Sequence, residues 1–204
     1  AINLAYSFAE AGKKVLLLEA DMRLPTIAKR IGLVSAPGLS NLLAGLCTGS
    51  EVLQSSRLLP NFYVTTAGNL PPNPSELLGS EQMVIAMKSM AQEFDFIVLD
   101  LPPVNVVSDA LVASKLISGM IVVVRQNYSN RQSVSEAIRH LSILESKILG
   151  FVMTRANEQK RTYKKYASKY SYSGDYRAGY ERASHQKKEG NLDHTVEPKE
   201  SGRK

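Results

Sequence analysis

Two apolar segments of this 204-residue chain end in carboxylates, and these groups are well suited to phosphate chemistry. Glu19 and Asp21 follow the apolar run in VLLLEADMRLP, and Asp100 ends the run in FDFIVLDLPP. A carboxylate at the end of a buried strand is the Walker B arrangement, in which it reaches a magnesium ion or its water beside nucleotide phosphates. A single such Asp often only caps a turn, but two instances favour a nucleotide site. Pro102 and Pro103, which hold the chain just after Asp100, support the same interpretation.

A phosphate-binding loop does not accompany these acids. No GxxxxGK[ST] motif occurs, and Gly12-Lys13-Lys14 precedes an apolar run, where it predicts a turn. The chain begins with Ala1 in AINLAYSFAEAGKK, an amphipathic helical pattern with no N-cap ahead of it. We therefore expect the chain to be a piece of a longer protein.

Strand and helix patterns alternate between and around the acids. Short apolar runs without alternation predict strands buried on both faces, as in a parallel sheet covered by helices. The predicted strands are 15–20, 62–66, 96–99 (ending in Asp100), 120–124 and 148–153. Helical patterns follow near 75–92, 106–117 and 131–145. The predicted fold class is α/β, doubly wound around a mainly parallel sheet of the P-loop NTPase type, with ligands at the carboxyl ends of the strands.

Charge divides the chain into two parts. Residues 155–204 hold 13 of the 25 Lys and Arg and 7 of the 19 Asp and Glu, so their excess equals the whole net charge of +6. We expect one domain at 1–154, long enough to bury a core, and a basic tail at 155–204. The tail has few aliphatic residues, and this composition predicts disorder. Six of the nine tyrosines lie in it: Tyr163, Tyr166, Tyr170, Tyr172, Tyr176 and Tyr180.

Composition excludes some classes of protein. The single cysteine, Cys47, excludes an internal disulfide. No apolar run approaches the ~20 residues that cross a bilayer.

An exposed tyrosine cluster in a basic segment suits base stacking, anchoring at a membrane surface or phosphorylation.

The motifs together resemble one family. GKKVLLLEADMRLP, GNLPPNPSELLGS, FDFIVLDLPPVNVVSDA and the tyrosine-rich C-terminus occur in this order in the bacterial tyrosine autokinases of capsule and exopolysaccharide synthesis. The resemblance covers essentially the whole chain. In that family the phosphate loop directly precedes the helix that here begins at Ala1, so the resemblance implies truncation after the Walker A motif.

The resemblance implies roles for individual residues, with ATP and Mg²⁺ as cofactors. Asp21 and Glu19 match the Walker A′ acids beside the magnesium ion and the attacking hydroxyl, and Asp100 matches the acid that holds the metal. Glu19 departs from the usual Asp. Arg23 is expected to neutralise phosphate charge or to pair with a carboxylate. Thr154 stands where close relatives often have an Asn that reads the adenine.

The resemblance also implies an activity and partners. The protein is expected to be a tyrosine kinase that autophosphorylates its tail tyrosines and regulates polysaccharide synthesis or export. Expected partners are further copies of the chain, a transmembrane activator of the polysaccharide co-polymerase type, fused or separate, and a tyrosine phosphatase. No nucleic acid is expected. The implied location is the cytoplasm, at the inner face of the cell membrane.

Two further residues have more than one interpretation. Ser75 in PPNPSELL is placed to cap a helix beginning near Glu76, or its loop lines the active site or an oligomer contact. Asp109 caps the helix that follows the PPV loop, or it supports Asp100.

Two rival functions are considered. A partitioning or division-site ATPase would share the acidic strand ends but lack the tyrosine cluster. A nucleic-acid-binding module would use the basic aromatic tail for stacking. The absence of a basic groove in the neutral 1–154 segment argues against the second rival.

Overall fold

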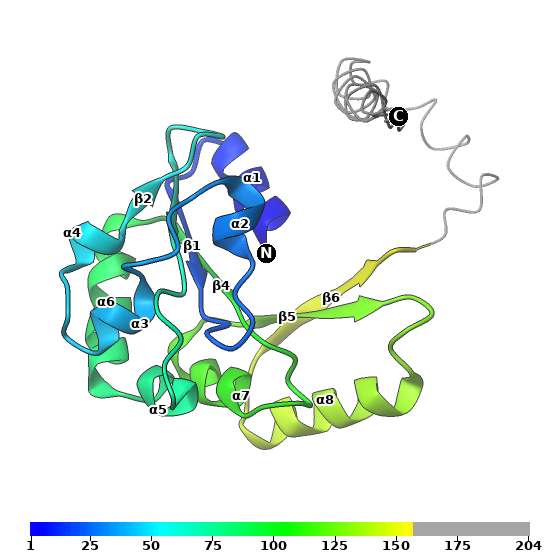
Figure 1. Ribbon diagram of the computed structural model, residues 1–204. Coiled ribbons are helices and arrows are strands. Elements are labelled where there is room, and N and C mark those ends of the chain that lie inside the picture. The colour runs from blue at the N-terminus through cyan, green and yellow to red at the C-terminus, as the bar shows by residue number, and fades with distance from the viewer. Residues whose placement is uncertain (157–204) are drawn as a thin grey trace, which may run out of the picture. The chain divides into compact units, whose positions relative to one another are not determined.

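The structure is a computed structural model that describes residues 1–156, and residues 157–204 lie outside it. The main sheet has the strand order β2-β3-β1-β4 (Figure 1). Strand β1 (Val15–Glu19) lies between β3 (Phe62–Thr65) and β4 (Phe96–Asp100) and is parallel to both. The short strand β2 (Gln54–Ser55) pairs antiparallel with β3. The predicted mainly parallel α/β sheet is confirmed.

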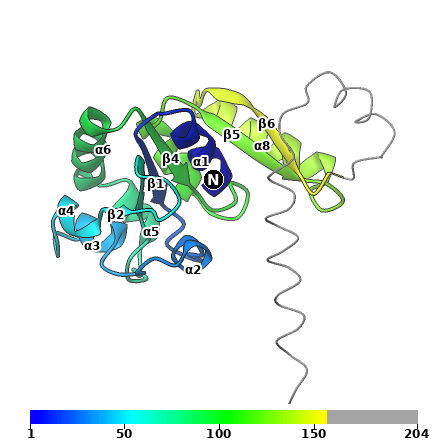
Figure 2. The same cartoon turned by 90° about the horizontal axis from the view of Figure 1, so that it is seen from above.

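Two further strands form a separate parallel pair. Strands β5 (Met120–Arg125) and β6 (Ile148–Thr154) pair with each other, and helix α8 (Arg131–Ile143) runs alongside them (Figures 1 and 2). Burial on both faces was predicted for every strand. The prediction holds for β1, which is buried along its whole length. It is wrong for β5, where Ile121 and Val123 are 39% and 62% exposed, because exposure alternates along this strand and only one of its faces is covered in the described part of the chain.

Helices cover both faces of the main sheet, as a doubly wound fold requires. On one face α1 (Ile2–Glu10) and α2 (Ile27–Ile31) pack on alternate residues of β1 and β3. On the other face α3 (Leu39–Leu43), α5 (Pro74–Leu78) and α6 (Glu81–Glu93) pack on Leu18 and the residues that follow β1. This alternation follows from the period-2 geometry of a strand, which sends successive side chains to opposite faces. A further short helix, α4 (Gly49–Val52), precedes β2.

Two predicted helices are shorter or divided in the structure. The pattern at 75–92 becomes α5 and α6, because the Ser80 hydroxyl accepts a hydrogen bond from the backbone N–H of Met83 (3.2 Å) and so begins a new helix. The pattern at 106–117 becomes α7 (Asp109–Ala113) and a 3₁₀ turn, η1 (Ser114–Leu116).

The predicted capping role of Ser75 is wrong. Helix α5 begins at Pro74 with Asn73 at the N-cap position, so Ser75 lies within the first turn. Proline suits the first helical position because the backbone N–H that it lacks would have no partner there. The Ser75 side chain is therefore free to bond elsewhere.

Within residues 1–156 no helix has the length and apolar character needed to cross a bilayer.

Candidate active site

The predicted acids gather at one edge of the main sheet. Glu19 and Asp100 are register partners at the carboxyl ends of β1 and β4, and the backbone N–H of Ala20 continues the ladder to the Asp100 carbonyl (2.9 Å). Asp21 follows two residues after Glu19. Parallel strands end at the same edge, so carboxylates separated by some 80 positions in the sequence come together there.

The Glu19 carboxylate organises the surrounding loops. Its side chain is 1% exposed. One oxygen accepts hydrogen bonds from the backbone N–H groups of Thr26 and Ile27, both at 2.6 Å, and the other accepts from Ala67 at 3.1 Å. A carboxylate with three backbone donors is held firmly in position. This geometry favours a positioning role, in which Glu19 joins the start of α2 to the loop after β3. Its catalytic role stays a prediction.

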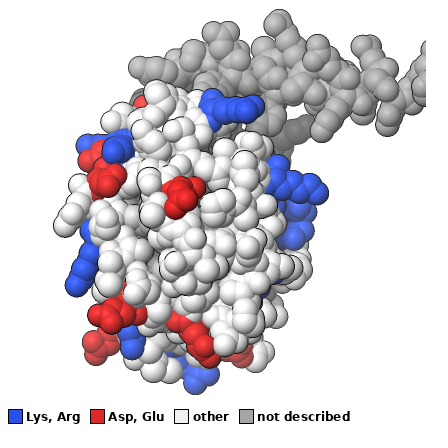
Figure 3. Space-filling view, turned by 60° about the vertical axis from the view of Figure 1, so that its left-hand side comes forward, with Lys and Arg blue, Asp and Glu red and all other residues white. Residues whose placement is uncertain are grey.

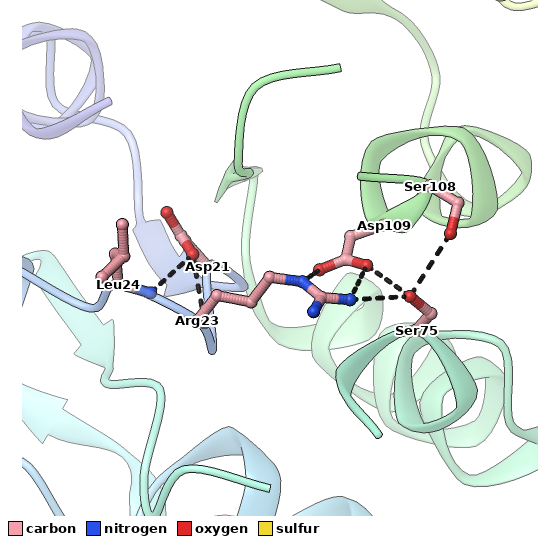
Figure 4. A network of polar contacts seen from close by, with 6 residues as sticks. All are labelled: Asp21, Arg23, Leu24, Ser75, Ser108 and Asp109. Atoms are coloured by element: carbon pink, nitrogen blue, oxygen red, sulfur yellow. Dashed lines mark hydrogen bonds and ion pairs between the residues drawn. The ribbon is translucent and has the colours of Figure 1, made fainter. Parts of the chain in front are cut away.

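Asp21 is only half-buried and keeps one oxygen open. Its Oδ1 accepts hydrogen bonds from the backbone N–H groups of Arg23 (3.1 Å) and Leu24 (3.0 Å), which form a tight turn after β1 (Figure 4). No bond to Oδ2 is present within residues 1–156. One oxygen therefore orients the carboxylate, and the other is left for a ligand.

The Asp100 carboxylate is half-buried and accepts no hydrogen bond from any described residue. Burial raises its pKa above the ordinary value, and the nearby charges of Glu19 and Asp21 raise it further. Arg30 acts in the opposite direction. A carboxylate disfavoured in this way by burial and by like charges is stabilised when a cation binds beside it.

Arg23 turns its side chain away from Asp21 and pairs with Asp109. Its Nε donates to one Asp109 oxygen (2.8 Å), and Nη2 donates to the other (2.9 Å) and to the Ser75 hydroxyl (3.2 Å) (Figure 4). The Ser75 hydroxyl also donates to Asp109 and lies 3.4 Å from the Ser108 hydroxyl. The Arg23 side chain is 39% exposed, whereas that of Asp109 is completely buried. Of the two roles expected for Arg23, pairing with a carboxylate is the one seen.

The Arg23 guanidinium holds the pKa of Asp109 below its usual range, and the Ser75 bond lowers it further against the effect of burial. Ser108, not Asp109, occupies the N-cap position of α7. From sequence, Asp109 is expected to cap the helix or to support Asp100. Its bonds to Arg23 and Ser75 are not predicted by the sequence. The one signal available was an Asp that opens a helix soon after an acidic strand end.

The other features predicted from sequence are the PPNPSELL loop, Thr154 and the tail tyrosines. The PPNPSELL loop and α3 line an open groove of about 390 Å³ that includes neither Asp21 nor Asp100. Thr154 ends β6, where its hydroxyl donates weakly to the Val124 carbonyl (3.5 Å). The six candidate acceptor tyrosines, Tyr163 to Tyr180, lie outside the described residues.

Two carboxylates fit a magnesium ion bound together with a nucleotide. In residues 1–156 no three His, Cys, Asp or Glu side chains are grouped closely enough to hold a metal by themselves. Magnesium usually takes one or two carboxylates, with substrate phosphates and waters completing its shell. The unbonded carboxylate of Asp100 supplies a direct ligand of that kind, and the open oxygen of Asp21 can accept a hydrogen bond from one of the metal's waters or from an acceptor hydroxyl.

Comparison with known proteins bears on the choice between a tyrosine kinase and a division-site ATPase. Residues 1–149 match the family model described as an AAA domain. The chain is 35% identical to a putative tyrosine-protein kinase, CapB of Staphylococcus aureus, covering 85% of the chain and 73% of CapB. It is 32% identical to the tyrosine-protein kinase YwqD of Bacillus subtilis, covering 85% of the chain and 70% of YwqD.

Solved structures agree with this result. The crystal structure of the chimerical protein CapA2B2 superposes with a TM-score of 0.73 at 34% identity, covering 76% of this chain and 68% of CapA2B2. The cell division ATPase MinD of Pyrococcus furiosus superposes with a TM-score of 0.61 at 23% identity, covering 76% of this chain and 66% of MinD. At that identity the likeness to MinD concerns the fold alone.

Proposed function

Because the chain belongs to the family of bacterial tyrosine-protein kinases, we propose that Asp21 and Asp100 form its phosphoryl-transfer site, with ATP as donor and Mg²⁺ as metal. The observation that carries this proposal is the placement of these two acids at one edge of the sheet, each with an oxygen free for a ligand. When bound, Mg²⁺ neutralises charge on the β- and γ-phosphates.

The three acids at the sheet edge would each have a separate role in phosphoryl transfer. Asp100 holds the metal, since its carboxylate is free of protein donors and gains most from a neighbouring cation. Asp21 Oδ2 orients the acceptor hydroxyl and receives its proton, because a tyrosine with a pKa near 10 is a weak nucleophile at neutral pH. Glu19 keeps the adjacent loops in place through its three backbone hydrogen bonds.

The proposed acceptors are the tail tyrosines, Tyr163, Tyr166, Tyr170, Tyr172, Tyr176 and Tyr180, in the same chain or in a neighbouring copy. We also propose that residues 1–154 form the kinase domain and 155–204 its substrate tail. Each phosphotyrosine adds roughly −1.5 to −2 charges at pH 7, so three or four would cancel the +6 of the tail. Phosphorylation of three or four tyrosines would therefore remove the attraction of the tail for acidic surfaces, and further phosphorylation would reverse it.

The setting proposed for this activity is capsule or exopolysaccharide synthesis at the cytoplasmic face of the membrane. It includes a transmembrane activator of the co-polymerase type, assembly with further copies, and reversal by a tyrosine phosphatase. Light scattering of the full-length protein before and after phosphatase treatment tests the link to assembly. A change in particle mass is expected, and an unchanged mass would contradict it.

The two rival functions receive less support. The identity to tyrosine kinases exceeds that to MinD, and the division-ATPase likeness extends only to the fold. On the face shown in Figure 3, Lys and Arg lie at the margin, interspersed with Asp and Glu, and form no basic groove for nucleic acid.

Magnesium-dependent nucleotide binding tests the metal site. Isothermal titration calorimetry of full-length Asp100→Asn should show ATP affinity that no longer improves when Mg²⁺ is added. Glu81→Gln, which removes an exposed carboxylate at the start of α6, is the matched control. An Asp100→Asn protein that keeps the full effect of Mg²⁺ would remove Asp100 from the site.

A further inference from the structure

Arg23 is anchored at both its backbone and its side chain, and the two anchors belong to different parts of the site. Its backbone N–H donates to Asp21 Oδ1 (3.1 Å), the oxygen that orients the candidate base. Its guanidinium grips both oxygens of Asp109, at 2.8 and 2.9 Å, at the start of α7. The turn that holds Asp21 is thus tied to a helix that begins 86 positions further along the chain.

A third segment joins the same cluster. Ser75, in the first turn of α5, donates to Asp109 and accepts from Arg23 Nη2 (3.2 Å). Figure 4 shows the guanidinium reaching from the Asp21 turn to Asp109, with Ser75 directly beside both groups. Arg23, Ser75 and Asp109 therefore connect the loop after β1 with the starts of α5 and α7.

The energetics make this cluster a rigid one. Asp109 is completely buried, and a buried carboxylate that loses its cationic partner is left uncompensated, which is costly. The bidentate pairing of a guanidinium with a carboxylate also fixes the relative orientation of the two side chains, which a lysine cannot do. Rotation of Arg23 out of this position would break both bonds to Asp109 at once.

We infer that Arg23 and Asp109 are positioning residues for tyrosine phosphorylation, which set the orientation of the Asp21 carboxylate through the turn they hold. The inference rests on the proposed function, since it assumes that Asp21 acts on the acceptor hydroxyl. It differs from direct phosphate neutralisation by Arg23. A phosphate ligand contributes to ATP affinity, whereas a positioning residue contributes to kcat once ATP is bound.

Steady-state kinetics of the full-length kinase on a tyrosine peptide, together with ATP affinity by calorimetry, distinguish the two roles. Arg23→Gln and Asp109→Asn should each lower kcat by about 10- to 100-fold, the usual effect of a small misplacement in a catalytic site. Their Kd for ATP should change by less than about 2-fold. The double variant should be no slower than the worse single one, because both changes break the same contact.

Lys29→Gln removes an exposed positive charge from α2, the helix that follows the same turn, and should leave kcat and Kd unchanged. Arg23→Lys, which keeps the charge but not the bidentate pairing, covers the case in which Arg23→Gln does not fold. Its kcat should lie below wild type with Kd unchanged.

Three results would overturn the inference: a large rise in ATP Kd with kcat intact for Arg23→Gln or Arg23→Lys, unchanged kcat for Asp109→Asn, or additive losses in the double variant. Failure of the proposed function gives a different result. In that case the wild-type protein itself would fail to phosphorylate the peptide.

Discussion

Glu19 and Asp100 lie opposite each other at the last paired position of β1 and β4, yet their carboxylates are engaged in opposite ways. The Glu19 carboxylate is saturated by three backbone N–H donors, whereas the Asp100 carboxylate accepts no hydrogen bond from residues 1–156. The acid that bonds most strongly to the protein has the least freedom to bind a ligand. The structure therefore separates a carboxylate that holds the site together from carboxylates that are available for chemistry.

Replacing Asp100 by Asn should stabilise the fold while it removes activity. The pKa of Asp100 is raised by burial and by its acidic neighbours, so its ionised form destabilises the folded state above the ordinary Asp pKa. Removing that charge should raise Tm at pH 7 by about 2–4 °C. Differential scanning calorimetry without nucleotide measures this change, with Glu81→Gln as control. A lower Tm would show that the Asp100 charge has a stabilising partner.

Replacing Glu19 by Gln should destabilise the protein. Two backbone N–H groups converge on one oxygen and a third on the other, and an amide nitrogen cannot accept a hydrogen bond from any of them. The free energy of unfolding should fall by about 2 kcal/mol, the usual scale for bonds to charged groups. Urea denaturation measures it. A variant of normal stability that has lost its kinase activity would favour a catalytic role for Glu19 instead.

Acid should weaken the fold through Asp109. Its pKa is lowered in the folded state, chiefly by Arg23, so its contribution is fully present above the ordinary Asp pKa of about 3.9. That contribution is lost as the pH falls from there through the lowered value. Unfolding free energies between pH 5 and pH 2.5 should therefore fall more steeply for wild type than for Asp109→Asn. Parallel curves would mean that the ion pair adds no pH-dependent stability.

Replacing Gly38 by Ala should disturb the loop after β3. A Cβ at Gly38 would lie 2.4 Å from both the Gly68 nitrogen and the Thr66 carbonyl oxygen, so one of the two backbone segments must move. Overpacking of this kind costs about 1–3 kcal/mol. Gly49→Ala is the matched control, because a Cβ at Gly49 meets no atom within 4 Å. Chemical denaturation of both variants compares them, and equal stabilities would contradict the predicted clash.

The sequence predicted the sheet and the acidic edge because both depend on local pattern. An apolar run that ends in a carboxylate specifies the strand and the position of its acid, as for Asp100. The partners of those acids depend on contacts across the fold. The Ala67 N–H that reaches Glu19 lies 48 positions away, and the Asp109 that binds Arg23 lies 86 away, so no local pattern indicates either. Helix ends were misplaced where a serine such as Ser80 begins a new helix.

Mapping of phosphotyrosines by mass spectrometry in the full-length protein after incubation with ATP and Mg²⁺ tests the central claim most directly. Wild type should carry phosphate on tyrosines between Tyr163 and Tyr180, while Asp21→Asn and Asp100→Asn should carry at least about 100-fold less at equal protein concentration. Lys29→Gln should match wild type. Tail phosphorylation that persists at the wild-type rate in both Asp variants would contradict the assignment of these two carboxylates as the phosphoryl-transfer site.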